Sequence, residues 1–235
     1  MQMLDNHISE NTVKLKNGRT THQEANLKKE IYFESGYFSQ SQFVSFSEQL
    51  RLVHSLNKKN ILEIGLGNGL VSDFLRKAGL NVTTLDINPN LNPDVVGSVE
   101  DLMSIFPKQK FDLVLCAEVL EHMPFEIFED LIFNISHITR EYVILTLPRA
   151  QRIICDIQFS IKVPRIPRIE RGIFLSIPQS KILPEHHWEL DSSKKTKLDE
   201  IVAILSKYFA VIDSGRFRFR SYHHYFVLKK TSSMK

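Results

Sequence analysis

The sequence predicts an α/β fold built on a parallel sheet, and three segments carry this prediction. Residues 61–64 have strand character and run directly into a glycine-rich turn, which is followed by apolar residues at helical spacing. Residues 81–85 are rich in β-branched side chains, which favour strands. Residues 111–116 are almost continuously apolar, as expected of a parallel strand that is buried on both faces.

Composition narrows the class of protein. A chain of 235 residues suits one domain, and 43% hydrophobic with 24% charged residues is ordinary for a globular protein. A net charge of +3 is too small to indicate nucleic-acid binding by itself. No apolar run reaches the length of a membrane span. Two cysteines, Cys116 and Cys155, make no disulfide framework, so we expect a cytoplasmic protein.

The N-terminal part is polar at first and then rich in aromatic residues. We expect residues 1–30 to form a polar, partly disordered segment and residues 31–235 to form a single domain. Four aromatic side chains lie within residues 32–38, among them Tyr32 and Tyr37. Two interpretations stay open for them: a hydrophobic clasp on the core, or a lid over a ligand.

The turn after residue 64 contains Gly65, Gly67 and Gly69, with Glu63 just before them. Glycine is needed where backbone approaches a ligand closely, and the helix that follows directs free N–H groups at that ligand. The Gly-Lys-Ser/Thr end of a phosphate loop is absent. A dinucleotide fingerprint would need glycine or alanine where Leu70 stands. The alternative is a structural turn that binds nothing.

Asp86 ends the second predicted strand, roughly 20 residues beyond the glycines. A carboxylate at this point can accept hydrogen bonds from both hydroxyls of a ribose. Capping the turn at Asn88-Pro89 is the other role for such an aspartate. The glycines upstream favour ribose binding.

Two motifs together resemble a known family. The segment Glu63–Gly69 is similar to motif I of the class I S-adenosylmethionine (SAM) dependent methyltransferases. The segment 111–122, Phe-Asp-x-Val-x-x-x-Glu-Val-Leu-Glu-His, resembles the fourth-strand segment of the group that includes the quinone-biosynthesis enzymes. The resemblance covers about residues 55–148. It implies a Rossmann-like, doubly wound, mostly parallel seven-stranded sheet with an antiparallel closing strand and helices on both faces.

The same resemblance implies SAM as the cofactor and S-adenosylhomocysteine (SAH) as the product. Ser98 stands where the family usually has an aspartate that contacts adenine, so the adenine contact stays open between this residue and its neighbours. Glu100 and Asp101 also suit the start of a helix. The cofactor-binding residues expected on this basis are Glu63, Gly65, Leu66, Gly67, Gly69, Asp86, Ile87, Ser98, Val99, Glu100, Ala117 and Glu118.

Residues 149–190 interrupt the alternation of strands and helices, and we expect a substrate-side insertion there. Its basic residues suit an anionic group on a substrate, although a solvated basic face explains them equally well. The substrate-binding residues expected from the two regions are Tyr32, Tyr37, Arg165 and Arg168.

Three histidines are candidate acid–base residues: His122, His186 and His187. His122 is equally suited to a hydrogen bond with backbone at the edge of the loop. The spacing of His186, His187 and Glu189 matches no known set of metal ligands, so no metal site is expected. In residues 216–220 arginine and phenylalanine alternate, which predicts phenylalanines toward the core and arginines toward solvent.

These observations predict an enzyme, a SAM-dependent methyltransferase that acts on a small molecule. An RNA methyltransferase is a less favoured alternative, because Ala117-Glu118-Val119-Leu120 replaces the tetrapeptide that acts on base amino groups. A non-catalytic SAM-binding protein is the second alternative. The acceptor atom and the oligomeric state are not specified by the sequence.

Overall fold

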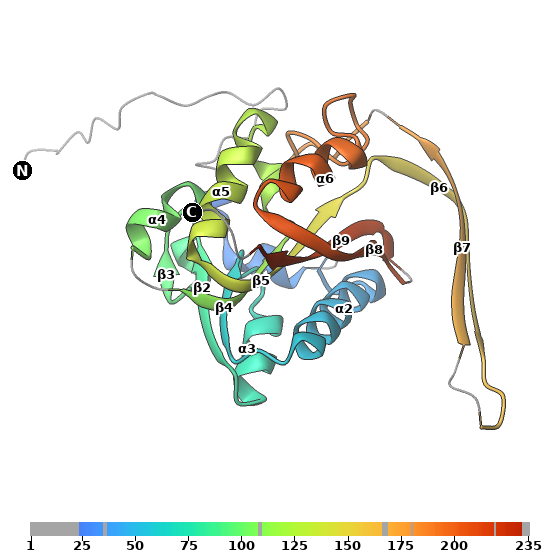
Figure 1. Ribbon diagram of the computed structural model, residues 1–235, viewed down its shortest axis with the longest axis horizontal. Coiled ribbons are helices and arrows are strands. Elements are labelled where there is room, and N and C mark those ends of the chain that lie inside the picture. Colours follow the sequence, from blue (N-terminus) through green and yellow to red (C-terminus); the bar gives the residue numbers. More distant parts are fainter. Residues whose placement is uncertain are drawn as a thin grey trace, which may run out of the picture.

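A computed structural model describes residues 24–34, 37–107, 110–165, 169–179, 181–218 and 220–231. A seven-stranded sheet runs through its centre in the order β3-β2-β1-β4-β5-β9-β8 (Figure 1). The first five of these strands are parallel, and β9 is antiparallel to both of its neighbours. The strands are β1 (Asn60–Ile64), β2 (Asn81–Asp86), β3 (Val95–Val96), β4 (Phe111–Ala117), β5 (Thr139–Pro148), β8 (Phe209–Phe217) and β9 (Arg220–Lys230).

Helices cover both faces of this sheet. Apolar side chains of α2 (Gln40–Leu56) and α3 (Leu70–Lys77) pack on one face, and those of α5 (Phe128–Ile138) and α6 (Leu198–Ser206) pack on the other. Neighbouring residues of one strand enter opposite cores, as Ile61 and Leu62 of β1 do. The predicted fold class is therefore confirmed. The remaining helical segments are α4 (Leu102–Ile105) and the 3-10 turns η1 (Lys29–Phe33), η2 (Pro89–Leu91), η3 (Val99–Asp101), η4 (Leu120–His122) and η5 (Phe125–Ile127).

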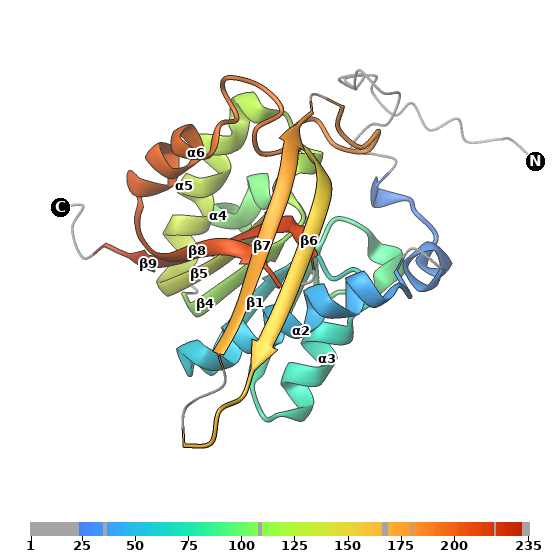
Figure 2. The same cartoon turned by 90° about the vertical axis from the view of Figure 1, so that its right-hand side faces the viewer.

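A separate two-stranded hairpin, β6 (Gln151–Ile161) with β7 (Ile169–Pro178), stands beside the main sheet. Figure 1 shows it running alongside the body, and in Figure 2 the same hairpin faces the viewer. Much of the insertion expected over residues 149–190 is therefore a regular hairpin. The proline Pro164 lies at the turn end of the hairpin, where it interrupts no ladder hydrogen bond.

The two C-terminal strands agree only in part with the predicted alternation of phenylalanine and arginine. Phe217 is buried and stacks on Tyr225, as expected, with ring centroids 5.5 Å apart. Arg216 and Arg220, however, are partly buried, so the prediction that the arginines face solvent was wrong for these two. A register shift between Arg216 and Phe217 breaks the strict alternation, and Arg220 pairs with the buried Phe217, so the two side chains share one face of the sheet.

The expected polar N-terminal segment lies largely outside the described residues, since residues 1–23 are not among them. Over the described part of the chain, none of the helices has both the length and the apolar character to cross a membrane.

Candidate active site

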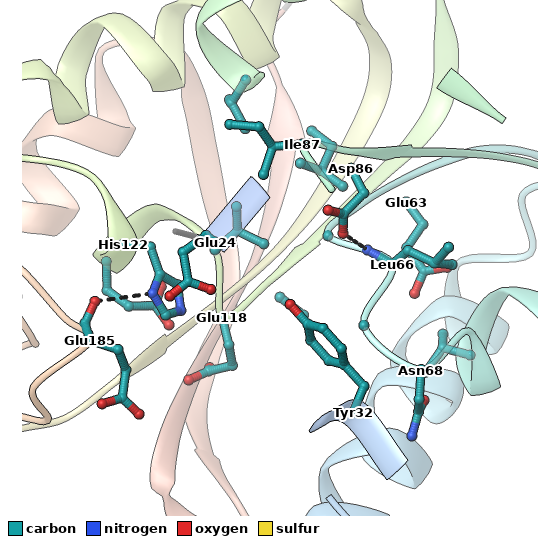
Figure 3. A pocket seen from close by; sticks show the side chains of 18 of the residues that line it. Glu24, Tyr32, Glu63, Leu66, Asn68, Asp86, Ile87, Glu118, His122 and Glu185 are labelled. Carbon is teal, nitrogen blue, oxygen red and sulfur yellow. Dashed lines mark hydrogen bonds between the residues drawn. The ribbon is translucent and has the colours of Figure 1, made fainter. Parts of the chain in front are cut away.

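A cavity of about 450 Å³ lies at the carboxyl ends of the parallel strands. The ends of β1, β2 and β4 contribute Gly65, Asp86 and Glu118, respectively, to its wall. Ligands bind at this edge of open α/β sheets because the strand order reverses there and leaves a crevice. Figure 3 shows Glu63, Leu66 and Asp86 toward one end of the cavity and Glu118, His122 and Glu185 toward the other.

The glycine turn forms one wall, and its glycines serve different purposes. Gly65 has φ +85°, and a Cβ there would lie only 2.4 Å from Cγ2 of Val119. Gly67 has φ +55° and lines the cavity, and a Cβ there would meet nothing within 4 Å. Gly69 does not line the cavity. It has φ +76° and is the N-cap residue of α3.

The side chain of Asp86, at the end of β2, is hydrogen-bonded to the glycine turn that follows β1. Its Oδ2 accepts a hydrogen bond of 2.7 Å from the backbone N–H of Leu66, and its Oδ1 accepts one of 2.8 Å from the N–H of Asn88. Burial raises the pKa of Asp86, and these backbone donors oppose the rise. A carboxylate oxygen has more than one lone pair, so these bonds leave it able to accept from a ligand hydroxyl.

Glu63 is nearly inaccessible to solvent, with 4% of its surface exposed, yet it lines the cavity. Burial raises its pKa to about 8, against the lowering effect of Ser72 and Arg76. Its Oε2 has no hydrogen-bond partner among the described residues. A buried acceptor without a partner calls for an explanation, and a cationic ligand in the cavity supplies one.

The expected adenine region lies along the same cavity. Ile87, Ser98, Val99 and Glu100 all line it, whereas Asp101 does not. The Ser98 hydroxyl accepts a hydrogen bond of 3.2 Å from the N–H of Glu100 and so caps η3. Capping η3 is therefore a structural role for Ser98. This role is compatible with the adenine contact that the sequence predicts, because Ser98 also lines the cavity.

Glu118 sits at the end of β4 with a left-handed backbone, φ +55°. Its Oε1 accepts a hydrogen bond of 2.7 Å from the Thr146 hydroxyl, and its Oε2 lies 3.5 Å from Nε2 of His223. Burial raises the pKa of Glu118 to about 8, with Arg220 acting in the opposite direction. Ala117, just before it, also lines the cavity.

The far end of the cavity joins two segments that are about 65 residues apart in the chain. Glu121 and His122 come from η4, and His186 comes from the loop between β7 and α6. The rings of His122 and His186 are nearly perpendicular, with centroids 5.0 Å apart. His187 does not line the cavity. Its backbone N–H donates to the Glu121 carbonyl at 2.8 Å, and burial lowers the pKa of its ring.

Of the residues expected to bind substrate, the structure brings two to the cavity. Tyr32 and Tyr37 both line it, with ring centroids 5.1 Å apart, and burial raises the pKa of Tyr32. Arg165 is exposed at the turn end of the β6–β7 hairpin and is not among the lining residues. Arg168 lies outside the described residues.

Strand β9 supplies lining residues that the sequence did not predict: Arg220, Tyr222 and His223. Arg220 donates a hydrogen bond of 2.6 Å to the Ser41 hydroxyl on α2 and lies against the Tyr222 ring. Its position in an alternating strand predicted a solvent-facing side chain. No local pattern distinguishes it from its neighbours, because the face on which it lies is set by its pairing with Phe217 of β8.

Similarity to known proteins agrees with this geometry. Residues 41–150 match the family described as "Methyltransferase domain". This match spans less than half of the chain, and it confirms the resemblance carried by Glu63–Gly69 and residues 111–122.

Among curated relatives, a ubiquinone biosynthesis O-methyltransferase from Hydrogenovibrio crunogenus is 33% identical over 92 residues. That match spans 33% of this chain and 37% of the relative. The corresponding protein from Xanthomonas campestris pv. campestris is 37% identical over 78 residues, or 27% of this chain and 32% of the relative. The chain thus matches only about a third of the length of these relatives.

Solved structures share the fold at low sequence identity. Magnesium protoporphyrin IX methyltransferase from Synechocystis, with bound SAM, has a TM-score of 0.51 and 18% identity over 81% of this chain and 79% of that one. The N-methyltransferase NodS from Bradyrhizobium japonicum, in complex with SAH, has a TM-score of 0.55 and 13% identity over 90% of this chain and 96% of that one.

Proposed function

We propose that this protein is a SAM-dependent methyltransferase that acts on a small-molecule acceptor. The observation that carries the proposal is the direct bond between Asp86 and the glycine turn at the rim of one cavity. The turn offers backbone that a ligand can approach, and the adjacent carboxylate offers acceptors for ribose hydroxyls. The names of the relatives that match part of this chain support this choice, and so do the neighbours crystallised with SAM or SAH.

The charge of the cavity suits this cofactor. Arg220 is the only lysine or arginine among the described residues that line it. SAM carries a positive sulfonium and a positive ammonium group, which such a surface attracts. We assign the ammonium group to Glu63 and the ribose to Asp86. The acidic lining residues are Glu24, Glu63, Asp86, Glu100, Glu118, Glu121 and Glu185.

Methyl transfer from a sulfonium is an in-line displacement with a good leaving group. The main work of the protein is to position the two reactants and to exclude water. Tyr32 and Tyr37 line the cavity and pack against each other, so they are placed to exclude solvent and to contact the acceptor.

We also propose that residues 31–235 form one domain with the β6–β7 hairpin as an insertion. We propose a cytoplasmic location because both cysteines are free thiols.

The deciding experiment measures SAM and SAH binding by calorimetry and then methyl transfer to a panel of small acceptors. We expect wild-type protein to bind both ligands and Asp86→Ala to bind SAM at least about tenfold more weakly, because charge-assisted hydrogen bonds contribute about 1.5 kcal/mol or more. Asp101→Ala is the matched control, since Asp101 is exposed and outside the cavity wall.

Equal SAM affinity in Asp86→Ala and wild-type protein would refute the ribose assignment. Binding of SAM without transfer to any acceptor would favour the non-catalytic alternative. Co-purified RNA, together with a steep loss of binding as salt rises, would favour an RNA substrate instead.

A further inference from the structure

The far end of the cavity, where we place the methyl acceptor, contains side chains that have no role in binding the proposed cofactor. Glu121, His122 and His186 each offer one ligand atom, and these three atoms lie within 4.8 Å of one another. Nε2 of His186 lies 4.0 Å from Oε1 of Glu121. We propose that these three residues bind a divalent transition-metal ion, such as Zn²⁺ or Mn²⁺, with open coordination positions toward the acceptor.

The unpaired carboxylate of Glu121 is the observation that most requires a ligand. Its side chain is completely buried, and neither Oε1 nor Oε2 has a hydrogen-bond partner among the described residues. An unpaired carboxylate in such a place is strongly disfavoured unless a cation compensates it. Arg220, the one arginine that lines the cavity within the described part of the chain, is directed instead to Ser41 and the Tyr222 ring.

The two imidazoles are oriented as metal ligands usually are. Nδ1 of His186 is 2.9 Å from Oε1 of Glu189, and Nδ1 of His122 is 3.2 Å from the carbonyl oxygen of Glu185. Because an oxygen acceptor faces Nδ1 in both rings, we assign the proton to Nδ1 and the lone pair to Nε2. A second hydrogen bond to a carboxylate or a carbonyl is the arrangement that fixes metal-bound histidines.

The supporting residues are themselves held in place. Oε1 of Glu189 also accepts hydrogen bonds from the Tyr222 hydroxyl at 2.8 Å and from the Leu183 N–H at 3.0 Å. The loop that carries His186 is bonded to the segment around η4, since Trp188 donates to the Met123 carbonyl at 3.1 Å. The site is therefore built on a rigid frame rather than on a free surface.

The ligand set defines the class of metal. Two imidazoles and one carboxylate suit Zn²⁺, Mn²⁺ or Fe²⁺, whereas Mg²⁺ and Ca²⁺ prefer oxygen ligands. Two ligand atoms that each lie about 2.1 Å from a tetrahedral ion are about 3.4 Å apart. Closing the present cluster around an ion thus requires the 4.0 Å between Nε2 of His186 and Oε1 of Glu121 to shorten by about half an ångström, and the widest pair of ligand atoms, within 4.8 Å, to shorten by up to about 1.4 Å. The metal role replaces the acid–base role that the sequence suggested for His122 and His186.

The position of the site has a consequence for the acceptor, which rests on the proposed methyltransferase function. A metal with open positions binds oxygen donors and lowers the pKa of a bound hydroxyl. A hydroxyl group of the acceptor, bound to the ion, loses its proton to water. Its oxygen then forms the new O–CH₃ bond while the S–CH₃ bond breaks, and the electron pair stays on sulfur to give SAH. The site thus favours hydroxylated acceptors and O-methylation.

The test titrates Co²⁺ into the full-length, chelator-treated protein without SAM and follows the visible absorption of the bound ion. We expect saturation at about one equivalent. We expect His186→Ala and Glu121→Gln to weaken binding by roughly 100-fold or more, and Glu189→Gln to weaken it by roughly tenfold through loss of orientation. His187→Ala is the matched control, because this neighbouring histidine lies outside the cavity wall, and it should bind Co²⁺ like wild type.

Circular dichroism and SAH calorimetry accompany each variant. Glu121→Gln keeps the shape of the side chain, so retained SAH binding shows that the variant is folded. Absence of saturable Co²⁺ binding to wild-type protein would overturn the proposal, and so would unchanged binding in both His186→Ala and Glu121→Gln. Metal binding without SAH binding would refute the methyltransferase proposal alone, whereas SAH binding without metal binding would refute the metal site alone.

Discussion

Gly65 and Gly67 both have positive φ angles, yet the structure gives them different reasons to be glycine. A side chain on Gly65 would collide with Val119, which is part of the protein itself. A side chain on Gly67 would point into open space at the cavity wall. The first glycine therefore serves the fold, and the second keeps the space that we assign to the cofactor.

This difference predicts opposite phenotypes. We expect Gly65→Ala to lower the free energy of unfolding by more than about 2 kcal/mol, because a left-handed backbone costs about 1–2 kcal/mol and the collision adds to it. Gly67→Ala should lower it by only about 1–2 kcal/mol but weaken SAM binding at least about tenfold. Urea titrations and calorimetry measure the two quantities. Wild-type SAM affinity in Gly67→Ala would contradict this assignment.

At the scale of elements, the β6–β7 hairpin exposes large apolar side chains on both of its strands. Ile157 and Ile173 are cross-strand partners, and they are 53% and 60% exposed, respectively. In contrast, Ile144 in the middle of β5 is completely buried. Apolar area contributes to stability only where it is removed from water. The hairpin is therefore a separate layer that adds little to the core.

We predict that replacing both Ile157 and Ile173 with threonine changes the free energy of unfolding by no more than about 0.5 kcal/mol. Threonine keeps the β-branched shape that strands favour. The same replacement at Ile144 should cost about 2 kcal/mol or more, because it places a hydroxyl in the core and removes a packed methyl group. Thermal and urea unfolding of the three proteins test this contrast. Equal losses at the exposed and buried sites would show that the hairpin is packed in solution.

At the scale of the whole molecule, buried acids make the stability depend on pH. Burial raises the pKa of Glu63 from 4.5 to about 8. The folded state therefore holds the proton over a range in which the unfolded chain has lost it. Stability from this group is complete below about pH 4.5 and is lost as the pH rises through about 8.

We expect the free energy of unfolding of wild-type protein to fall between pH 5 and pH 8 relative to that of Glu63→Gln. The difference should approach about 1.4 kcal/mol per pH unit where the unfolded glutamate is ionised and the folded one is not. Urea titrations of both proteins at several pH values measure it. A constant difference across this range would contradict a raised pKa for Glu63.

The parts of this protein that its sequence determined are those fixed by short-range chemistry. The glycines after β1 allow the positive φ angles of the turn, Asp86 ends a β-branched strand, and residues 111–116 are apolar enough to be buried on both faces. These local features define the parallel half of the sheet and the turn at its edge. Each depends on residues within one or two elements, so a pattern in the chain is sufficient to find it.

Only the tertiary structure decided which distant side chains share the cavity. Arg220 turns inward because it pairs with the buried Phe217 across the β8–β9 ladder. The approach of His186 to Glu121 depends on how the loop before α6 packs on η4. The two strands of the β6–β7 hairpin were also not predicted from the sequence, because the prolines and basic residues of this segment are typical of a loop. Contacts between residues far apart in the chain are set by packing of the whole molecule, and no local pattern records them.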